Sequence, residues 1–306
     1  MPPRGGVGGS APRASTDGLV IVDKPAGRTS HDVVARIRRL AGTRRVGHAG
    51  TLDPMATGVL VIGVGKATRL LGHLALTEKQ YLATIRLGQS TDTGDAEGTV
   101  LAGAPASGLT GPGIQAAADS LTGDIQQVPP AVSAVKVNGQ RAYRLARQGR
   151  APALPPRPVT VSQFRITAIR PAGELLDADA EVTCSSGTYV RALARDLGEA
   201  LGTGGHLTML RRTRVGHYDV SAARTLDQLT QRLEVVPLAA AAADAFPAWR
   251  LTSEQAGALS HGATLAMDGA AVGGAGPVAA FGPDGTLIAL VEERAGLARP
   301  VAVFVP

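Results

Sequence analysis

The sequence predicts an α+β fold, in which a mixed, largely antiparallel sheet is flanked by helices and followed by a small β-rich unit. Short apolar or alternating stretches, typical of strands, are separated by segments whose apolar residues recur at helical spacing. Near Phe246 and Pro247 the composition changes, and the chain becomes rich in glycine and in short strand-like stretches. We therefore expect a disordered tail at residues 1–17, a large unit at 18–245 and a small unit at 246–306.

The composition favours a soluble globular protein with a polyanionic partner. Of the 306 residues, 44% are hydrophobic and 18% are charged, and the net charge is +6; such a basic balance suits binding to a nucleic acid. The single cysteine, Cys184, cannot form an internal disulfide, which fits a reducing compartment. No apolar run is long enough to span a bilayer, and the N-terminus lacks the apolar core of a signal peptide. We expect a cytoplasmic protein without membrane contact.

The large unit begins with a strand and a basic helix. Residues 18–23 are apolar and form the strand, after which Thr29 or Ser30 caps an amphipathic helix. Residues 28–45 hold six arginines against one acid, Asp32. We favour a phosphate-contacting patch over a solvated basic face, because the patch leads directly into the next loop.

That loop, residues 47–54 (GHAGTLDP), is the strongest candidate site in the first third of the chain. Its two glycines permit unusual backbone angles, and Pro54 restricts the conformation of Asp53. The loop presents one carboxylate, Asp53, and one imidazole, His48, beside residues 56–65, which have the pattern of a buried strand. The alternative is a turn whose aspartate binds its own backbone.

The next elements are a helix over residues 66–76, a strand over 79–87, a polar loop over 90–108 and a helix over 111–122. Tyr81 lies on the buried face of the expected strand, so it is either a ring for stacking on a base or an ordinary core tyrosine.

A second basic segment follows a Pro-rich stretch. Arg141, Arg144 and Arg147 recur at helical spacing, and with Lys136 they could grip an RNA backbone as a mobile arm. The alternative is a solvated helix.

Two more strands, over residues 158–169 and 175–184, precede a helix that Thr188 can cap and that ends near Leu201. Tyr189 and Arg191 lie in its first turn. A third basic cluster, residues 210–214, follows a glycine-rich turn and includes Arg211 and Arg212.

Several motifs are excluded. The segment around residues 60–68 lacks a Walker glycine at Leu60 and a hydroxyl at Ala67, and Thr68 replaces the last glycine of a dinucleotide fingerprint. The histidines and Cys184 have no metal-ligand spacing. Cys184 could attack C6 of a pyrimidine, but an inert core thiol is the favoured interpretation because it lies within a strand pattern.

The remaining groups form a coherent set. An ionised Asp53 in a partly dry site requires a nearby cation, and Arg191, at a helix start, is the best candidate. Tyr81 can stack on a base, and the basic clusters can hold phosphates. The set fits a carboxylate nucleophile that acts on an extruded base.

Five segments then resemble the bacterial tRNA pseudouridine synthases of the TruB type, which isomerise uridine 55 of the TΨC arm. They are GLVIVDKPAGRTSHDVV, GHAGTLDPMATGVLVIGVGKATR, KQYLATIRLGQSTDTGDAEG, VPPAVSAVKVNGQRAYRLARQG and SGTYVRALARDLGEALGTGGHLTMLRRTRVG, in the order of the family. The resemblance covers nearly the whole chain after Gly18.

The resemblance implies the pseudouridine-synthase fold and a role for each matching residue. Asp53 matches the nucleophile, Arg191 its ionic partner, and Tyr81 the ring stacked on the target uracil. Three more residues match: His48 at the space left by the flipped base, Tyr189 in the same segment as Arg191, and Leu210 in the apolar wall of the uracil pocket. Residues 126–150 match an RNA clamp, and the C-terminal unit matches a PUA-like module. That unit has three arginines against five acids, so the basic surface belongs to the larger unit.

The implied reaction is a base isomerisation without cofactor or metal, with attack by Asp53 at uracil C6 or at ribose C1′. The expected partner is tRNA, with no protein partner required and a monomeric enzyme. Two alternatives stay open. One is a uracil-C5 methyltransferase using Cys184, which would need a methyl-donor loop; the other is a tRNA-binding or tRNA-folding protein that does not need catalysis.

Overall fold

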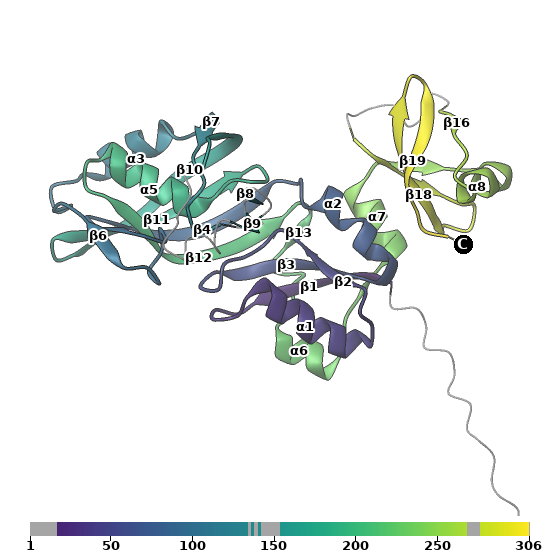
Figure 1. Ribbon diagram of the computed structural model, residues 1–306, viewed down its shortest axis with the longest axis horizontal. Helices are drawn as coiled ribbons and strands as arrows, with labels where there is room; N and C mark the ends of the chain where they lie inside the picture. Colours follow the sequence, from purple (N-terminus) through teal and green to yellow (C-terminus); the bar gives the residue numbers. More distant parts are fainter. Residues whose placement is uncertain (1–16, 134–135, 138–139, 142–153, 268–275, 306) are drawn as a thin grey trace, which may run out of the picture.

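The structure is a computed structural model, and it describes residues 17–133, 136–137, 140–141, 154–267 and 276–305. A ten-stranded mixed sheet forms its largest part (Figure 1). The strands along its main path are β14 (Val236–Pro237), β1 (Gly18–Lys24), β3 (Thr57–Val64), β12 (Gly205–Val215), β4 (Lys79–Leu87), β11 (Leu175–Cys184), β10 (Arg157–Ala172) and β7 (Gly123–Gln127). In addition β2 (Val46–Ala49) pairs with β3, and β13 (Tyr218–Asp219) pairs with β12. Among the strand pairings described for this sheet, only β12–β3 is parallel, which confirms the predicted mixed, largely antiparallel sheet.

Strand β12 joins two parts of this sheet. It pairs with β4 from Gly205 to Val215, but with β3 only where Arg211 and Arg212 face Thr57 and Gly58. At Gly58 the backbone has φ +99°, and a Cβ would lie 2.1 Å from the Arg212 carbonyl oxygen. Only glycine allows this close approach of the two strands.

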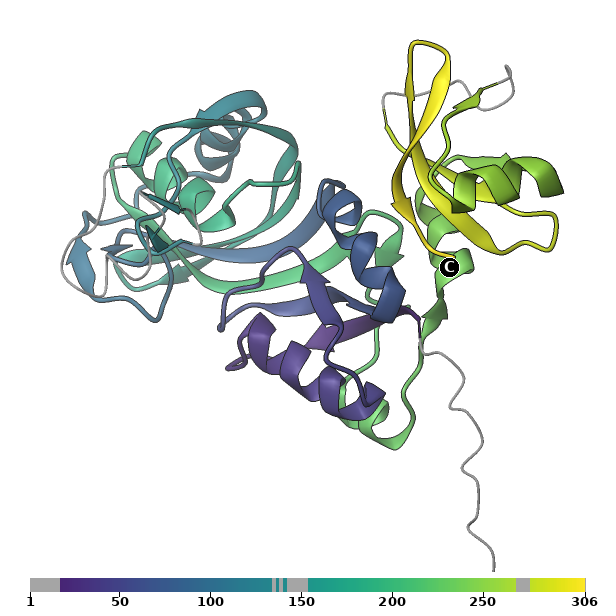
Figure 2. The ribbon, with the colours of Figure 1, turned by 45° about the vertical axis from the view of Figure 1, so that its right-hand side comes forward.

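Helices cover one face of both parts of the sheet and share one core with it (Figure 2). They are α1 (Ser30–Ala41), α6 (Leu226–Gln231), α3 (Gly111–Asp119) and α5 (Val190–Ala200). Thr29 caps α1 in a capping box with Asp32, as its position before the apolar residues predicts. The buried apolar residues of α1 are Val33, Val34 and Ile37, at helical spacing.

The opposite face of the β1–β3 part packs against the C-terminal sheet. That sheet has the order β15 (Ala248–Arg250), β17 (Val278–Phe281), β18 (Leu287–Arg294), β19 (Leu297–Val303) and β16 (Leu265–Ala266), with α8 (Ser253–Ser260) beside it. Between the two sheets lie η1 (Gly65–Arg69), α2 (Leu71–Leu74) and α7 (Leu238–Ala245). Phe281 and Phe304 are buried in the same apolar cluster as Leu19 and Val61. The predicted β-rich C-terminal part is thus present, and it packs against the larger sheet.

Two hairpins lie outside these sheets. One joins β5 (Ser90–Thr91) to β6 (Val100–Ala102), and the other joins β8 (Lys136–Val137) to β9 (Gln140–Arg141). In the part of the chain that the structure describes, no helix combines the length and apolar character needed to cross a membrane.

Several predicted elements are corrected. The segment 47–54 is not all loop, because its first residues form β2; the expected helix 66–76 is divided into η1 and α2; and residues 90–108 contain a hairpin. Tyr189, not Thr188, is the N-cap residue of α5. The basic cluster 210–214 lies inside the central strand β12, although the sequence placed a strand only after it.

Candidate active site

The loop that carries Asp53 is fixed by hydrogen bonds along its backbone. We call residues 50–54 the Asp53 loop. Leu52 is bonded through both its N–H and its carbonyl to the Ser30 hydroxyl of α1, at 2.9 and 3.0 Å. The Pro54 carbonyl accepts from the Gly27 N–H at 2.9 Å and from Lys24 Nζ at 3.2 Å. These bonds attach the second half of the loop to Ser30 of α1, to Lys24 of β1 and to Gly27.

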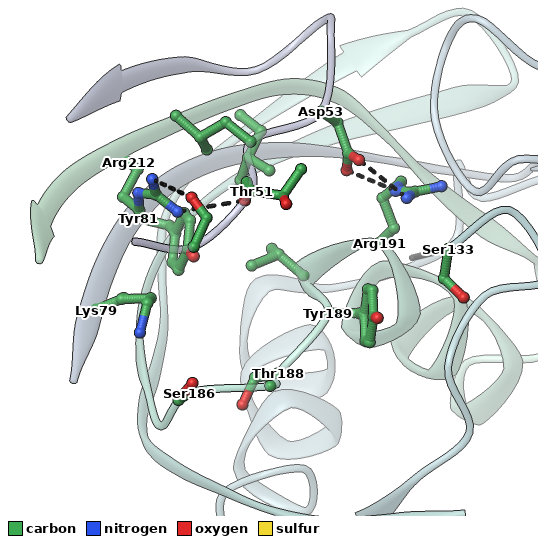
Figure 3. Close-up of a pocket in the computed structure, with 15 residues that line it drawn as sticks. Thr51, Asp53, Lys79, Tyr81, Ser133, Ser186, Thr188, Tyr189, Arg191 and Arg212 are labelled. Carbon is green, nitrogen blue, oxygen red and sulfur yellow. Dashed lines mark hydrogen bonds and ion pairs between the residues drawn. The ribbon is translucent and has the colours of Figure 1, made fainter. Parts of the chain in front are cut away.

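Arg191 holds the Asp53 carboxylate with two hydrogen bonds (Figure 3). Its Nε donates to Oδ2 at 2.9 Å, and its Nη2 donates to Oδ1 at 3.2 Å. The side chain of Arg191 is 5% exposed, while that of Asp53 is 33% exposed. The guanidinium thus orients the carboxylate and balances its charge, yet the carboxylate stays open to a substrate.

Arg191 is itself held by other groups. Its Nη1 donates to the Thr93 carbonyl at 2.7 Å, and its Nη2 donates to the Val132 carbonyl at 2.9 Å. Asp95, which is buried, lies 3.7 Å from Arg191 Nε and forms a second ion pair. Asp95 was not predicted as a site residue, because residues 90–108 have the pattern of a polar loop; only the fold brings Asp95 beside Arg191.

A cavity of about 250 Å³ opens beside this ion pair. Figure 3 shows side chains from both parts of the sheet and from the start of α5 around it. The lining includes, among others, Asp53, Lys79, Tyr81, Ser133, Thr188, Tyr189, Arg191, Leu210 and Arg212. Six predicted residues therefore meet at one cavity, although they come from distant parts of the sequence: Asp53, Tyr81, Tyr189, Arg191, Leu210 and Arg212.

The two tyrosines give the cavity its aromatic surfaces. Tyr81 projects from β4 and is 7% exposed. Its burial raises the pKa of its hydroxyl, and burial also raises that of Tyr189. Both rings therefore stay neutral at physiological pH, and they can pack against the faces of a planar base.

His48 lies on β2, outside the group of residues that line the cavity. Its ring meets the ring of His31 edge-on, with centroids 5.7 Å apart. The structure thus places His48 beside the Asp53 loop and not on the cavity wall.

Two arginines of the third basic cluster that were predicted to contact phosphates, Arg211 and Arg212, differ in exposure. Arg211 forms a bidentate ion pair with Asp23, with Nη2–Oδ2 at 2.8 Å, and it is partly exposed. Arg212 also lines the cavity but is only 1% exposed, so the structure presents Arg211, and not Arg212, at the surface for the predicted contact with the RNA backbone.

The structure describes only part of the predicted basic arm, which comprises Lys136, Arg141, Arg144 and Arg147. Lys136 and Arg141 face each other in the β8–β9 hairpin, so Arg141 lies in a strand and not in the expected helix. Arg144 and Arg147 lie outside the described residues.

Two buried lysines that no sequence pattern singled out lie at the site: Lys79 lines the cavity, and Lys24 is bonded to the Asp53 loop. Lys24 Nζ donates to three carbonyls, of Pro25, Arg28 and Pro54, and burial lowers its pKa to about 8. Lys79 Nζ donates to the carbonyls of Ala75 and Thr77, and burial, with Arg212 nearby, lowers its pKa to about 8.

Cys184 is buried, and burial raises the pKa of its thiol to about 11. A thiol protonated at neutral pH is a poor nucleophile, which favours the inert core thiol over the methyltransferase alternative. Among the described residues, no group of three or more His, Cys, Asp or Glu side chains is placed to hold a metal ion.

Comparison with known families agrees with this site. Residues 38–190 match the model of the TruB family pseudouridylate synthase N-terminal domain. Residues 191–239 match the tRNA pseudouridylate synthase B C-terminal domain, and residues 246–305 match the tRNA pseudouridine synthase II C-terminal domain. The chain belongs to the TruB family of pseudouridylate synthases. Because pseudouridine is an isomer of uridine, this membership places it among the isomerases.

Individual relatives of this TruB-family chain cover almost all of it. The tRNA pseudouridine synthase B of Thermobifida fusca is 62% identical over 292 residues, which are 94% of this chain and 98% of that protein. The protein of the same name from Streptomyces coelicolor is 59% identical, covering 94% of this chain and 97% of that protein.

Solved structures support the fold of the family. A chain in the structure of an H/ACA RNP bound to a substrate RNA containing 2′-deoxyuridine is 25% identical, with a TM-score of 0.71, over 95% of this chain and 86% of that chain. A chain of a Cbf5–Nop10–Gar1 complex is 28% identical, with a TM-score of 0.70, over 95% of this chain and 84% of that chain. These neighbours agree with the predicted pseudouridine-synthase fold.

Proposed function

We propose that this protein converts uridine 55 in the TΨC loop of tRNA to pseudouridine, with Asp53 as the nucleophile. The observation that carries the proposal is the Asp53 carboxylate, held by Arg191 at 2.9 and 3.2 Å at the edge of a cavity that Tyr81 also lines. The names of the close relatives support tRNA as the substrate.

The reaction begins when the uridine is flipped out of the RNA and its base enters the cavity. Tyr81 stacks on the uracil, and Leu210 forms an apolar wall. Tyr189, at the start of α5, lines the side next to Arg191. His48, beside the Asp53 loop, props the space that the flipped base leaves in the RNA. These contacts hold the base while its bond to the ribose changes.

Asp53 then attacks either C6 of the uracil or C1′ of the ribose. In both routes the N1–C1′ bond breaks, the base turns, and a C5–C1′ bond forms. The C5 proton is lost and N1 gains a proton, so atoms and electrons balance without an oxidant or a reductant. Arg191 keeps the carboxylate aligned with the reacting carbon and balances its charge when the carboxylate is released.

The rest of the chain binds the RNA. Residues 126–150 act as a clamp, in which Lys136, Arg141, Arg144 and Arg147 contact phosphates, and Arg211 contributes from the rim of the cavity. We propose a tail at residues 1–17, a catalytic domain at 18–245 and a PUA-like domain at 246–306. In this account the enzyme is a cytoplasmic monomer that needs no protein partner and no cofactor.

The test is pseudouridine mapping of an unmodified tRNA transcript after incubation with the purified protein or with Asp53→Asn. We expect one new pseudouridine, at position 55, with the wild-type protein and none with the variant, while both bind the transcript. Pseudouridine formed by Asp53→Asn at the wild-type rate would refute the role of Asp53. Salt-dependent binding without product from the wild-type protein would favour the tRNA-binding alternative.

A further inference from the structure

Arg212 is the largest fully buried side chain in the described part of the molecule, and it is only 1% exposed. A charged group is costly to bury unless hydrogen bonds replace its water. The structure gives the Arg212 guanidinium no carboxylate at ion-pair distance among the described residues. Its charge must therefore be stabilised by something else.

Three of its hydrogen bonds go to backbone carbonyls of β3 and of the Asp53 loop, and the guanidinium also interacts with the Tyr81 hydroxyl. Arg212 Nε donates to the Val59 carbonyl at 2.7 Å. Its Nη2 donates to the Gly50 carbonyl at 3.1 Å, and its Nη1 makes a longer bond to the Thr51 carbonyl at 3.4 Å. One planar guanidinium thus connects strand β3 to the first two residues of the Asp53 loop, as Figure 3 shows for the loop contacts.

The backbone of Arg212 lies at the junction of three strands. In β12 it is paired with Tyr81 of β4 on one side and with Gly58 of β3 on the other. Tyr81 is the ring proposed to stack on the base, and Gly58 is the second residue of β3, the strand that follows the Asp53 loop. A single residue therefore touches, through backbone or side chain, the elements that carry the nucleophile and the aromatic ring.

Among the described residues, no other group donates a hydrogen bond to the carbonyls of Gly50 and Thr51. Ser30 binds Leu52, and Gly27 and Lys24 bind Pro54, but these contacts hold the second half of the loop. Gly50 has φ +81°, a conformation that the residue itself does not restrict. Arg212 therefore supplies the restraint on this half of the loop.

We propose that Arg212 is a positioning residue, whose guanidinium fixes the Asp53 loop and thereby sets the place of the nucleophile relative to Tyr81. This inference rests on the proposed function. The Arg212 guanidinium sets the distance between Asp53 and Tyr81, which act on the same base. Loss of the guanidinium therefore lowers the rate of the chemical step and leaves RNA binding almost unchanged.

The test compares Arg212→Met and Arg212→Lys with wild type and with Arg86→Met as a control. Arg86 lies on the neighbouring strand β4, outside the cavity lining, and forms a half-buried bidentate pair with Asp177, with both bonds at 2.8 Å. For each protein we would measure the single-turnover rate at saturating tRNA, the Kd for tRNA and the Tm. Rates would be measured at two temperatures well below the lowest Tm.

We expect Arg212→Met to lose about 100-fold in single-turnover rate, the size of effect typical of a nucleophile displaced by about 1 Å. Its Kd should stay close to that of wild type, and the loss should persist at both temperatures. Arg212→Lys keeps the charge but cannot reach three carbonyls, so its rate should be intermediate. Arg86→Met should lower Tm without lowering the rate at either temperature.

Three results would overturn the inference. The first is a rate for Arg212→Met that equals that of Arg86→Met. The second is a rise in Kd as large as the fall in rate, which would indicate direct RNA contact. If Arg212→Met does not fold, a wild-type rate for folded Arg212→Lys is the third. Absence of pseudouridine with the wild-type protein would instead refute the proposed function itself.

Discussion

Two buried lysines of the site, Lys24 and Lys79, are 0% and 5% exposed, and burial lowers the pKa of each to about 8. In the unfolded chain the pKa of each is about 10.5. Between these values the folded protein binds fewer protons than the unfolded chain, so the free energy of unfolding rises with pH. Below pH 8 both lysines are charged in both states, and the cost of burying them is at its full value.

We predict that the free energy of unfolding rises less steeply with pH in Lys79→Met than in wild type, because the variant lacks the contribution of Lys79. Each lysine contributes at most about 1.4 kcal/mol per pH unit to the slope. Urea unfolding of wild type and variant between pH 8 and 9 would measure it; above that window Cys184, whose pKa burial raises to about 11, acts in the opposite direction. Equal slopes for the two proteins would show that Lys79 does not titrate as the structure implies.

At the scale of elements, the start of α5 depends on a glutamine from the sheet edge. Tyr189, the N-cap residue, makes no side-chain capping bond. Instead Gln127 of β7, which is 1% exposed, accepts from the Tyr189 N–H at 2.8 Å and donates to its carbonyl at 3.2 Å. This pair fixes the turn of helix that carries both Tyr189 and Arg191.

We therefore predict that Gln127→Leu destabilises the protein by about 1–3 kcal/mol, because it leaves a buried N–H without a partner. The rate of pseudouridine formation should fall as well, because Tyr189 lines the cavity. Gln126→Leu is the matched control for stability, since Gln126 is exposed on the same strand. Similar unfolding free energies for the two variants, from urea titrations, would contradict the capping role.

At the scale of the whole molecule, the C-terminal sheet shares a core with the larger sheet. Phe304, 2% exposed, lies in one apolar cluster with Leu19 and Leu70. Arg69 of η1 also donates to the Val303 carbonyl of β19. These contacts couple the stability of the C-terminal sheet to that of the part that carries the candidate site.

We predict that Phe304→Ala costs about 3–5 kcal/mol and lowers the stability of both parts together. Trp249 is the only tryptophan and lies in β15, so its fluorescence reports on the C-terminal sheet, while loss of activity on heating reports on the site. Both midpoints should shift by the same amount. Val301→Ala, at a position 42% exposed on β19, should shift neither. A shift in the fluorescence alone would show that the two parts unfold independently.

Local patterns in the sequence were sufficient for most of the long strands and for the face of α1. Strand β4 was predicted with the bounds Lys79–Leu87, because alternation over nine residues leaves little ambiguity. Strand β12 was missed, because its arginines hide the alternation that a central strand normally shows. The short β2 was missed because its pairing with β3, and not its own composition, makes it a strand.

By itself, the sequence determined the α+β class, the basic character and the candidate groups Asp53, Tyr81 and Arg191, since these follow from local periodicity, charge and family motifs. Only the tertiary structure decided which charges stay in water. Arg211 and Arg212 are adjacent in one basic cluster, yet Arg211 pairs with Asp23 at the surface while Arg212 turns inward to Gly50 and Thr51. Alternate residues of a strand face opposite sides, and the carbonyls that accept from Arg212 lie more than 150 residues away in the chain. No local pattern can show such a partner.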